Sequence, residues 1–244
     1  MKWADVDKQA LRERMWDELE ERGVARFPFP PHGRIPNFAG AEAAAERLAD
    51  TPEWAAADAV KANPDAPQLP VRRRALRVEK TAYMAVPRLR DERCFLELDP
   101  ARIDDTDAAA TISSADDYAE RVGPEALPAI DLVVSGSVAV TETGARVGKG
   151  EGYSDLEFAL LREIGLVDDD TTTATTVHEI QVVDEPVEVD PHDVPMDLVL
   201  TPERTIRTTA GVKPSGIDWG GLSEERIEEI PVLARLASRP TDSE

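Results

Sequence analysis

Three consecutive stretches decide the fold: DLVVSGSVAV (131–140), ETGARVGKGEGYSD (142–155) and LEFALLREIG (156–165). The first is a short, continuous apolar run bounded by turn formers, which is typical of a central strand buried on both faces. The third has apolar residues at helical spacing from Leu156 to Ile164. A strand, a glycine-rich loop and a helix in this order build ligand sites in α/β proteins.

The rest of the chain continues this alternation. Leu11, Met15 and Leu19 predict an opening helix that stops at Gly23. Further helices are expected over 41–49, 70–78 and 223–237, and strands over 55–60, 81–86, 94–98, 171–183 and 197–206. The stretch 26–40 is expected to be an ordered loop that packs Phe27, Phe29 and Phe38, and 104–117 an acidic surface loop.

This order of elements predicts the α/β class. We expect a three-layer α/β/α sandwich with a mostly parallel central sheet. The sequence has no internal repeat and no long linker, so a single domain is expected over 1–237, with a flexible C-terminal tail at 238–244.

Composition excludes several classes of protein. The 244 residues are 41% apolar, enough for a core, and no run approaches the ~18 apolar residues of a membrane span. The N-terminal residues do not resemble a signal peptide, so a cytoplasmic protein is expected. A single cysteine, Cys94, excludes an internal disulfide framework and is expected to be a small core residue.

The charge is strongly acidic, with 49 acidic and 28 basic residues and a formal net charge of −21. Only 6 of the basic residues are lysines. An acidic surface poor in lysine is expected of a protein kept soluble at molar salt, where screening shrinks to about 3 Å. A halophilic protein is therefore our hypothesis, and an acidic mesophilic protein the alternative. Nucleic acid is an unlikely default partner, because its backbone is bound by clustered cations.

The basic cluster of Arg72, Arg73, Arg74 and Arg77 is a local exception. It is interpreted as a solvated helix face, with a polyanion site as the alternative. Arg34, in the GRIPNF loop, is expected to pair with an acid.

The glycine-rich loop is the sharpest candidate site. Gly148, Gly150 and Gly152 alternate between a buried strand and a helix, and Lys149 adds a cation. Exposed amides at the positive end of a helix attract phosphate oxygens. The spacing is neither a Walker A motif nor GxGxxG, so a plain glycine turn stays open.

Other catalytic patterns are weak. No two of the three histidines have metal-site spacing, and no serine lies in a GxSxG motif. His178 is expected to be packed or at the surface. Asp193, in PHDVPMD (191–197), lies just before a strand, where a carboxylate can reach a metal. The alternative is that Asp193 is a simple turn residue.

Four segments together resemble the 5-formyltetrahydrofolate cyclo-ligase (methenyltetrahydrofolate synthetase) family. KQALR (8–12) resembles its KxxxR motif, and 131–155 resembles DLxxxPGxxFDxxGxRxGxGxGYYD. PHDVPMDLVLT (191–201) resembles its HDxxxD strand, and GKGEGY (148–153) keeps its glycine spacing. Segments such as GRIPNFAG (33–40) are similar to an archaeal branch and to methenyltetrahydrofolate synthase domain-containing proteins.

The resemblance implies a fold of the CoA-transferase-like kind and an activity. In this family, ATP phosphorylates the formyl oxygen of 5-formyltetrahydrofolate, and N10 then closes the 5,10-methenyl ring with release of ADP and phosphate. Such chemistry needs positioning and charge neutralisation more than a protein nucleophile. ATP, Mg²⁺ and a reduced folate are thus the implied ligands.

The resemblance also implies roles for individual residues. Lys149 and Tyr153 are the implied catalytic residues, and Asp155 and Asp193 are the implied Mg²⁺ ligands. The ATP-binding residues implied are Lys8, Arg12, Gly148, Lys149, Gly150, Glu151, Gly152 and Tyr153. Tyr153 also lines the folate pocket, where the family's folate-binding Glu is replaced by Asp65 or Gln68. Ser154 stands where the family has the second Tyr of GYYD.

Two further functions are carried as alternatives. One is a nucleotide-binding or regulatory member of this fold that lacks folate chemistry, or that binds RNA through the arginine cluster. The other is a sugar-phosphate or CoA-ester enzyme, because related folds host such functions.

Overall fold

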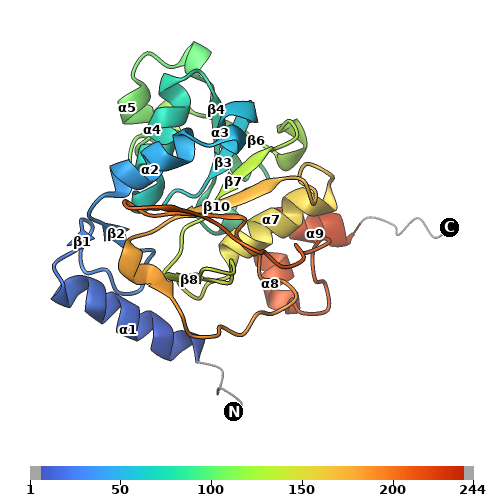
Figure 1. Cartoon of the computed structure of the whole chain (residues 1–244). Helices are drawn as coiled ribbons and strands as arrows, with labels where there is room; N and C mark the ends of the chain where they lie inside the picture. The colour runs from blue at the N-terminus through green and yellow to red at the C-terminus, as the bar shows by residue number, and fades with distance from the viewer. Residues whose placement is uncertain (1–6, 239–244) are drawn as a thin grey trace.

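An eight-stranded sheet forms the centre of the computed structural model, which describes residues 7–238 (Figure 1). Its strands, in spatial order, are β13 (Thr205–Arg207), β12 (Leu198–Leu200), β10 (Thr172–Thr176), β7 (Leu132–Val134), β3 (Ala59–Ala62), β4 (Thr81–Ala85), β5 (Phe95–Leu98) and β6 (Glu120–Val122). The five from β12 to β4 are parallel, and the strands at both edges run antiparallel to their neighbours. The predicted mostly parallel sheet is confirmed.

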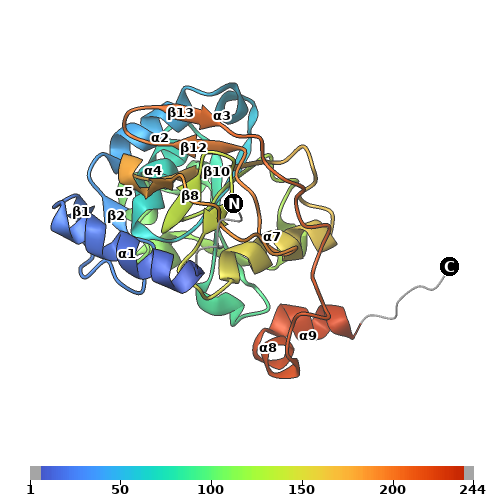
Figure 2. The same cartoon turned by 60° about the horizontal axis from the view of Figure 1, so that its bottom comes forward.

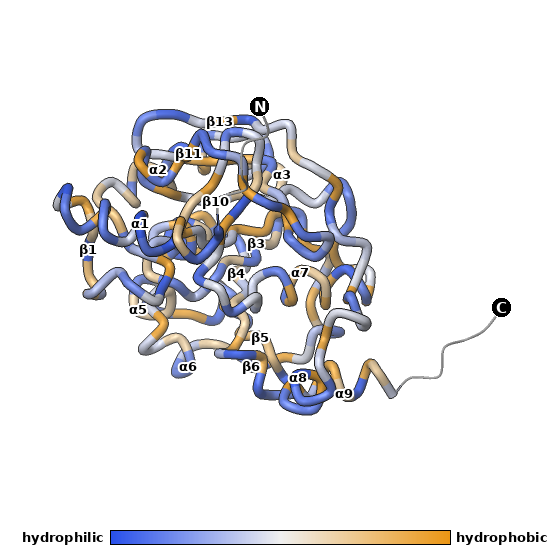
Figure 3. Tube along the Cα trace, turned by 90° about the horizontal axis from the view of Figure 1, so that it is seen from below, coloured by the Kyte–Doolittle hydropathy of each residue, from blue (hydrophilic) through white to orange (hydrophobic). Residues whose placement is uncertain are grey.

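Helices cover both faces of this sheet. The helices are α1 (Lys8–Glu21), α2 (Ala41–Ala49), α3 (Pro52–Ala56), α4 (Leu69–Arg77), α5 (Thr106–Ala109), α6 (Ala115–Tyr118), α7 (Tyr153–Glu163), α8 (Glu224–Glu229) and α9 (Pro231–Ala237). Figures 1 and 2 show α2 and α4 on one side of the sheet and α7 on the other. This is the expected three-layer arrangement. Figure 3 shows apolar residues concentrated along the inner strands and hydrophilic ones on the outer helices.

The parallel strands change direction of progression between β3 and β7. From β3 the chain crosses through α4 to β4 on one side, whereas from β7 it passes through α7 to β10 on the other. Ligands of open α/β sheets bind outside the carboxyl ends of the strands at such a switch point. The topology therefore points to the ends of β3 and β7 as the place for a site.

A second, smaller sheet is inserted after β7. It consists of β11 (Val182–Val183), β8 (Ala139–Thr141) and β9 (Arg146–Val147), and a two-stranded ribbon joins β1 (Ala25–Arg26) to β2 (Asn37–Phe38). Helix α1 packs on the small sheet through a separate apolar cluster that includes Leu11, Met15 and Leu19. Gly23, at φ 65°, follows α1 as predicted.

The stretch 131–140 is two strands rather than one. β7 ends at Val134, the chain leaves the large sheet at Ser135 and Gly136, and β8 starts at Ala139. A Cβ on Gly136 would lie 2.8 Å from the Ile35 side chain. Gly136 therefore lets the backbone pass close to Ile35 at the point where the chain moves from one sheet to the other. The apolar content of the stretch does not reveal this point.

Other boundaries also differ from the prediction. Residues 55–56 belong to α3, because Thr51 caps that helix and Pro52 occupies its first turn. The acidic stretch 104–117 contains α5 and α6, which bury Ala109 and Ala115. Pro231 divides the closing helix into α8 and α9.

The regions predicted as single strands over 171–183 and 197–206 each contain two. Phe38 is buried as expected, but Phe27 and Phe29 are 78% and 57% exposed, so their predicted packing is wrong. Cys94 is buried in the core as expected, and burial raises its pKa to about 12. The predicted tail after Ser238 lies outside the described residues.

Between residues 7 and 238, no helix combines the length and the apolar content that crossing a bilayer requires.

Candidate functional site

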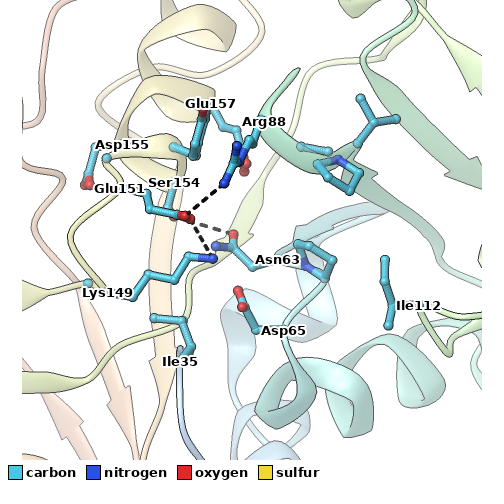
Figure 4. A pocket seen from close by; sticks show the side chains of 18 of the residues that line it. Ile35, Asn63, Asp65, Arg88, Ile112, Lys149, Glu151, Ser154, Asp155 and Glu157 are labelled. Atoms are coloured by element: carbon cyan, nitrogen blue, oxygen red, sulfur yellow. Dashed lines mark hydrogen bonds and ion pairs between the residues drawn. The ribbon is translucent and has the colours of Figure 1, made fainter. Parts of the chain in front are cut away.

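A cavity of about 330 Å³ opens at this switch point (Figure 4). Asn63 to Asp65, directly after β3, and Gly136, after β7, line it together with the turn after β4. The glycine-rich segment closes another side with Gly148, Lys149 and residues 151–155. Segments far apart in the sequence thus meet because the carboxyl ends of parallel strands share one edge of the sheet.

The glycine-rich loop is held in place by α1. The Arg12 Nε donates to the Gly148 carbonyl over 2.7 Å, and burial lowers the pKa of this guanidinium. A Cβ on Gly150 would lie 3.4 Å from the Arg12 Cζ, so the glycine lets the arginine pack against the backbone. Gly150 and Gly152 both have positive φ, at 103° and 71°, which explains the glycines at these two positions.

The loop delivers the chain into the N-terminus of α7. Gly152 is the N-cap of this 11-residue helix and has no side chain to accept the first amide hydrogens. These amides, at the positive end of the helix, are suited to phosphate oxygens. Of the predicted ATP-binding residues, Gly148, Lys149, Glu151, Gly152 and Tyr153 line the cavity, whereas Lys8, Arg12 and Gly150 are not among its lining residues.

Charges of both signs surround the mouth of the cavity. Glu151 lies 2.7 Å from the Lys149 Nζ and 3.9 Å from the Arg88 guanidinium, as Figure 4 shows. Asp65, the predicted folate-binding substitute, points from the opposite wall toward Lys149 (Figure 4). Burial raises the pKa of Asp65, and the charges of Lys149 and Arg72 only partly offset this.

Tyr153 receives an arginine from the far end of the chain. The Arg226 guanidinium, on α8, lies 4.1 Å from the centre of the Tyr153 ring and donates to the Glu151 carbonyl over 2.9 Å. Such stacking is a cation–π interaction. Arg226 therefore holds both the Tyr153 ring and the loop before it, through one cation–π contact and one hydrogen bond. Nothing in the sequence spacing predicted these contacts.

The floor of the cavity contains a buried ion pair that the sequence did not suggest. Lys61, on β3, is fully buried, and its ammonium donates to Glu157, on α7, and to the Asn63 Oδ1 over 2.9 Å. The Ser154 hydroxyl donates to the Ser135 hydroxyl over 3.1 Å beside them. The available signal was a lysine inside an apolar strand and a glutamate inside the apolar stripe of α7.

Asp155 does not fit its predicted role as a magnesium ligand. Both of its carboxylate oxygens accept from the Arg146 Nη2 over 2.6 Å, and Oδ1 also accepts the amide hydrogen of Val194. Arg146 is itself buried and donates to the Gly136 carbonyl over 2.8 Å. This carboxylate therefore fastens the start of α7 to the small sheet and to the segment after residue 190.

Asp193 lies with Asp190 and His192 in one group whose ligand atoms are within 4.8 Å of one another. The Lys8 ammonium occupies this group, 2.7 Å from Asp193 and 2.9 Å from Asp190. Burial lowers the pKa of Lys8, but the hydrogen bonds to both carboxylates outweigh it, and the net shift is upward. The structure thus places Lys8 on Asp193, whereas Asp155, which accepts the amide hydrogen of the neighbouring Val194, is paired with Arg146 and is not part of this group.

Gln68 is fully buried and is not among the residues that line the cavity. Its Nε2 donates to Thr176 over 3.2 Å, while its Oε1 has no hydrogen-bond partner and faces Gly136 at the cavity wall. Of the two predicted folate-binding substitutes, Asp65 therefore lies in the cavity and Gln68 behind it.

The arginine cluster is not a continuous basic surface. Arg72 is buried and donates to backbone carbonyls, among them that of Ala110 over 3.0 Å, and burial lowers its pKa to about 10. Arg73 and Arg77 pair with Asp107, and Arg74 with Glu46. The prediction of a solvated helix face is thus correct for Arg73, Arg74 and Arg77 and wrong for Arg72.

Two remaining single-residue predictions have opposite outcomes. Arg34 forms no ion pair with any acid in the described part of the chain, and its Nε is buried without a partner, so the predicted pairing is wrong. His178 is half-buried, packs against Phe38 and caps a short 3₁₀ turn, as expected of a packed histidine.

Comparison with known proteins agrees with this geometry. The model of the 5-formyltetrahydrofolate cyclo-ligase family matches residues 4–202. The mouse methenyltetrahydrofolate synthase domain-containing protein is 44% identical over 239 residues, which cover 96% of this chain and 64% of the relative. Its human counterpart is 42% identical over 96% of this chain and 62% of its own length. The chain therefore spans less than two thirds of these relatives.

Among solved structures, the 5,10-methenyltetrahydrofolate synthetase of Aquifex aeolicus has a similar fold. Its TM-score is 0.53 at 19% identity, over 84% of this chain and 95% of that one. The family model covers the glycine-rich loop and all the residues that line the cavity, whereas Arg226 lies beyond it. The chain belongs to the 5-formyltetrahydrofolate cyclo-ligase family.

Proposed function

We propose that this chain converts 5-formyltetrahydrofolate to 5,10-methenyltetrahydrofolate and consumes ATP in the presence of Mg²⁺. One observation carries the proposal. A glycine-rich loop with an attached lysine, anchored by Arg12, borders a cavity at the switch point of the sheet. A polyphosphate site beside a ring-sized cavity is what an ATP-driven cyclisation requires.

In this proposal, the chain positions the reactants and stabilises charge. The loop amides at the start of α7 bind phosphate oxygens, and Lys149 stabilises the negative charge of the phosphoryl group as it moves to the formyl oxygen. N10 then forms its bond to the formyl carbon and loses its hydrogen as a proton to the departing phosphate or to solvent, while the bond between that carbon and the phosphate oxygen breaks. Tyr153, held by Arg226, positions the folate against the loop.

Mg²⁺ neutralises phosphate charge in such reactions. The residues that fit it are Asp193 and Asp190, because Asp155 is fully engaged by Arg146. Lys8, which now pairs with both of these carboxylates, also lies at the end of α1 that carries Arg12. We propose that Lys8 contacts phosphate when a nucleotide occupies the loop.

The engagement of Asp155 favours one second candidate, a member of the family that binds nucleotide without cyclising folate. Removal of a carboxylate from the metal site lowers catalysis more than it lowers nucleotide affinity, since much of that affinity comes from the loop. RNA binding through the arginine cluster has less support, because these arginines are buried or already paired with acids.

The test follows the near-ultraviolet absorbance of the methenyl product, with the purified chain, 5-formyltetrahydrofolate and Mg-ATP in KCl. We expect an ATP-dependent rise that falls about 10²- to 10³-fold in Lys149→Ala, as for the loss of one preorganised donor to a developing charge. Arg93→Ala removes an exposed cation outside the cavity and is the matched control. A flat trace from protein that still binds ATP favours the second candidate.

A further inference from the structure

Three side chains at the floor of the cavity form one hydrogen-bonded unit. Lys61 is 0% exposed and donates to both Asn63 and Glu157. Asn63 and Glu157 in turn line the cavity, while Lys61 lies behind them. Lys61 therefore contacts the two polar residues that line the cavity, but it does not line the cavity itself.

Stability does not explain a buried ion pair at this position. Apolar residues of similar volume in place of such a pair are often neutral or stabilising, because desolvation of the charges offsets their attraction. The residues next to the pair in sequence are apolar and buried, among them Val60 and Ala62 on β3 and Phe158 on α7. The polar unit is thus better explained by what it presents to the cavity.

Lys61 determines how the Asn63 amide is oriented. An ammonium group has only hydrogens to donate, so the amide must turn its oxygen toward it. The Ser154 hydroxyl, 3.5 Å from the same oxygen, also acts as a donor. The NH₂ group of Asn63 is consequently directed away from Lys61, and Figure 4 shows the side chain at the centre of the cavity.

Two polar atoms then remain for a ligand. Neither the Asn63 Nδ2 nor the Glu157 Oε1 has a hydrogen-bond partner among residues 7–238. Neither atom is fully buried, so both are open to the cavity. One is a donor and the other an acceptor, and Lys61 holds both. A floor with one donor beside one acceptor is complementary to a ring edge with an acceptor beside a donor.

We propose that Asn63 and Glu157 form a recognition pair for the cyclic amide edge of a pyrimidinone ring, with Lys61 as the residue that positions them. The ring carbonyl accepts from Asn63 and the adjacent ring N–H donates to Glu157. This inference deepens the proposed function and rests on it for the ligand, because the pterin of a reduced folate carries this edge at C4 and N3.

The pair selects against one close analogue. Replacement of the 4-oxo group by a 4-amino group turns the acceptor at C4 into a donor and the donor at N3 into an acceptor. Both contacts then become unfavourable, since donor meets donor and acceptor meets acceptor. An unpaired buried polar group costs about 1–3 kcal/mol, so we expect at least about tenfold weaker binding of the 4-amino compound.

The test measures the dissociation constants of 5-formyltetrahydrofolate and its 4-amino counterpart, by calorimetry without ATP. The wild-type chain should prefer the 4-oxo compound by at least about tenfold. In Asn63→Asp one carboxylate oxygen stays on Lys61 and the other faces the cavity as an acceptor, so the preference should fall or reverse. Lys80→Met is the control, because Lys80 bonds to the Ala57 carbonyl at the opposite end of the sheet.

Equal affinity of the wild-type chain for the two compounds, or binding of neither, overturns the inference without any variant. An unchanged preference in a folded Asn63→Asp variant overturns it as well. Turnover of 5-formyltetrahydrofolate without discrimination leaves the proposed function standing and removes the recognition pair. Discrimination without turnover does the reverse, so the two failures are distinguishable.

Discussion

The glycine-rich loop and the floor of the cavity face the same space but hold their charges in opposite ways. At the loop, the Lys149 and Glu151 side chains are 34% and 39% exposed. At the floor, Lys61 and Glu157 are 0% and 7% exposed. Exposed ion pairs contribute little and exchange partners easily, whereas a buried pair is costly to break.

This difference corresponds to two kinds of ligand. A polyphosphate must replace Glu151 as the partner of Lys149, and an exposed pair permits that exchange at low cost. A rigid ring needs donors and acceptors already in place, and a buried pair keeps them there. Arg226 belongs to neither kind of ion pair. It lies on α8, beyond the residues that the family model matches, and it holds the Tyr153 ring in place.

Breaking the floor should have the largest effect. Lys61→Met leaves Glu157 as a buried, unpaired charge, and we expect a loss of about 3–5 kcal/mol in the free energy of unfolding, measured by urea denaturation. The double variant Lys61→Met with Glu157→Leu should recover most of this loss. If the single variant is as stable as the wild type, the floor is not a fixed unit.

Loosening the connection between α8 and the loop should have a smaller effect. Arg226→Ala removes the cation over Tyr153 and the bond to the Glu151 carbonyl. Tyr153 and the loop are then held less firmly, so we expect the KM values for ATP and for the folate to rise about threefold to tenfold, and the loss of a cation–π contact of about 0.5–2 kcal/mol to lower the melting temperature slightly. Glu228→Ala, exposed on the same helix, is the matched control, and an identical change there would show that Arg226 is not specific.

Salt should sharpen the contrast between the exposed surface and the floor. With a net charge of −21, self-repulsion destabilises the folded chain at low ionic strength. The melting temperature should therefore rise from dilute to molar KCl. The coupling between Lys61 and Glu157 in a double-mutant cycle should stay constant, because buried pairs are screened little. A melting temperature that does not rise with salt contradicts the halophile hypothesis.

The smallest effect concerns Asp65. Because burial raises its pKa above 3.8, the folded chain binds this proton more tightly than the unfolded chain does. The ionised Asp65 carboxylate therefore lowers the free energy of unfolding. This loss is complete once the pH exceeds the pKa of Asp65 in the folded chain, and it disappears as the pH falls toward 3.8. Asp65→Asn should melt higher than the wild type at neutral pH, and the gap should close on acidification. A gap that does not vary with pH indicates a different cause.

Local patterns predicted much of the site. The alternating glycines, Lys149 and the helix that follows are adjacent in sequence, and Gly148, Lys149 and Gly152 line the cavity. Asp155 shows the limit of such reasoning. Its motif position suggested a metal ligand, but the motif does not reveal that Arg146 reaches both of its carboxylate oxygens.

The boundary errors have a common physical origin. An apolar run records that residues are buried but not which sheet buries them, so 131–140 read as one strand although Gly136 separates two. Phe27 and Phe29 were expected to pack within an ordered loop, yet both side chains lie at the surface. Helices α5 and α6 are single turns with buried alanines, and they contact α4 and β5 respectively.

The α/β class, the strand, loop and helix order around residues 131–165, and the glycine-rich loop follow from the amino-acid sequence alone, because period and glycine placement are local properties. Which charges meet depends on the folded chain. Lys61 and Glu157 are 96 positions apart, and Arg226 lies 75 positions beyond Glu151. Such pairs form because parallel strands and their crossover helices bring distant segments to one edge of a sheet, where burial selects the partners.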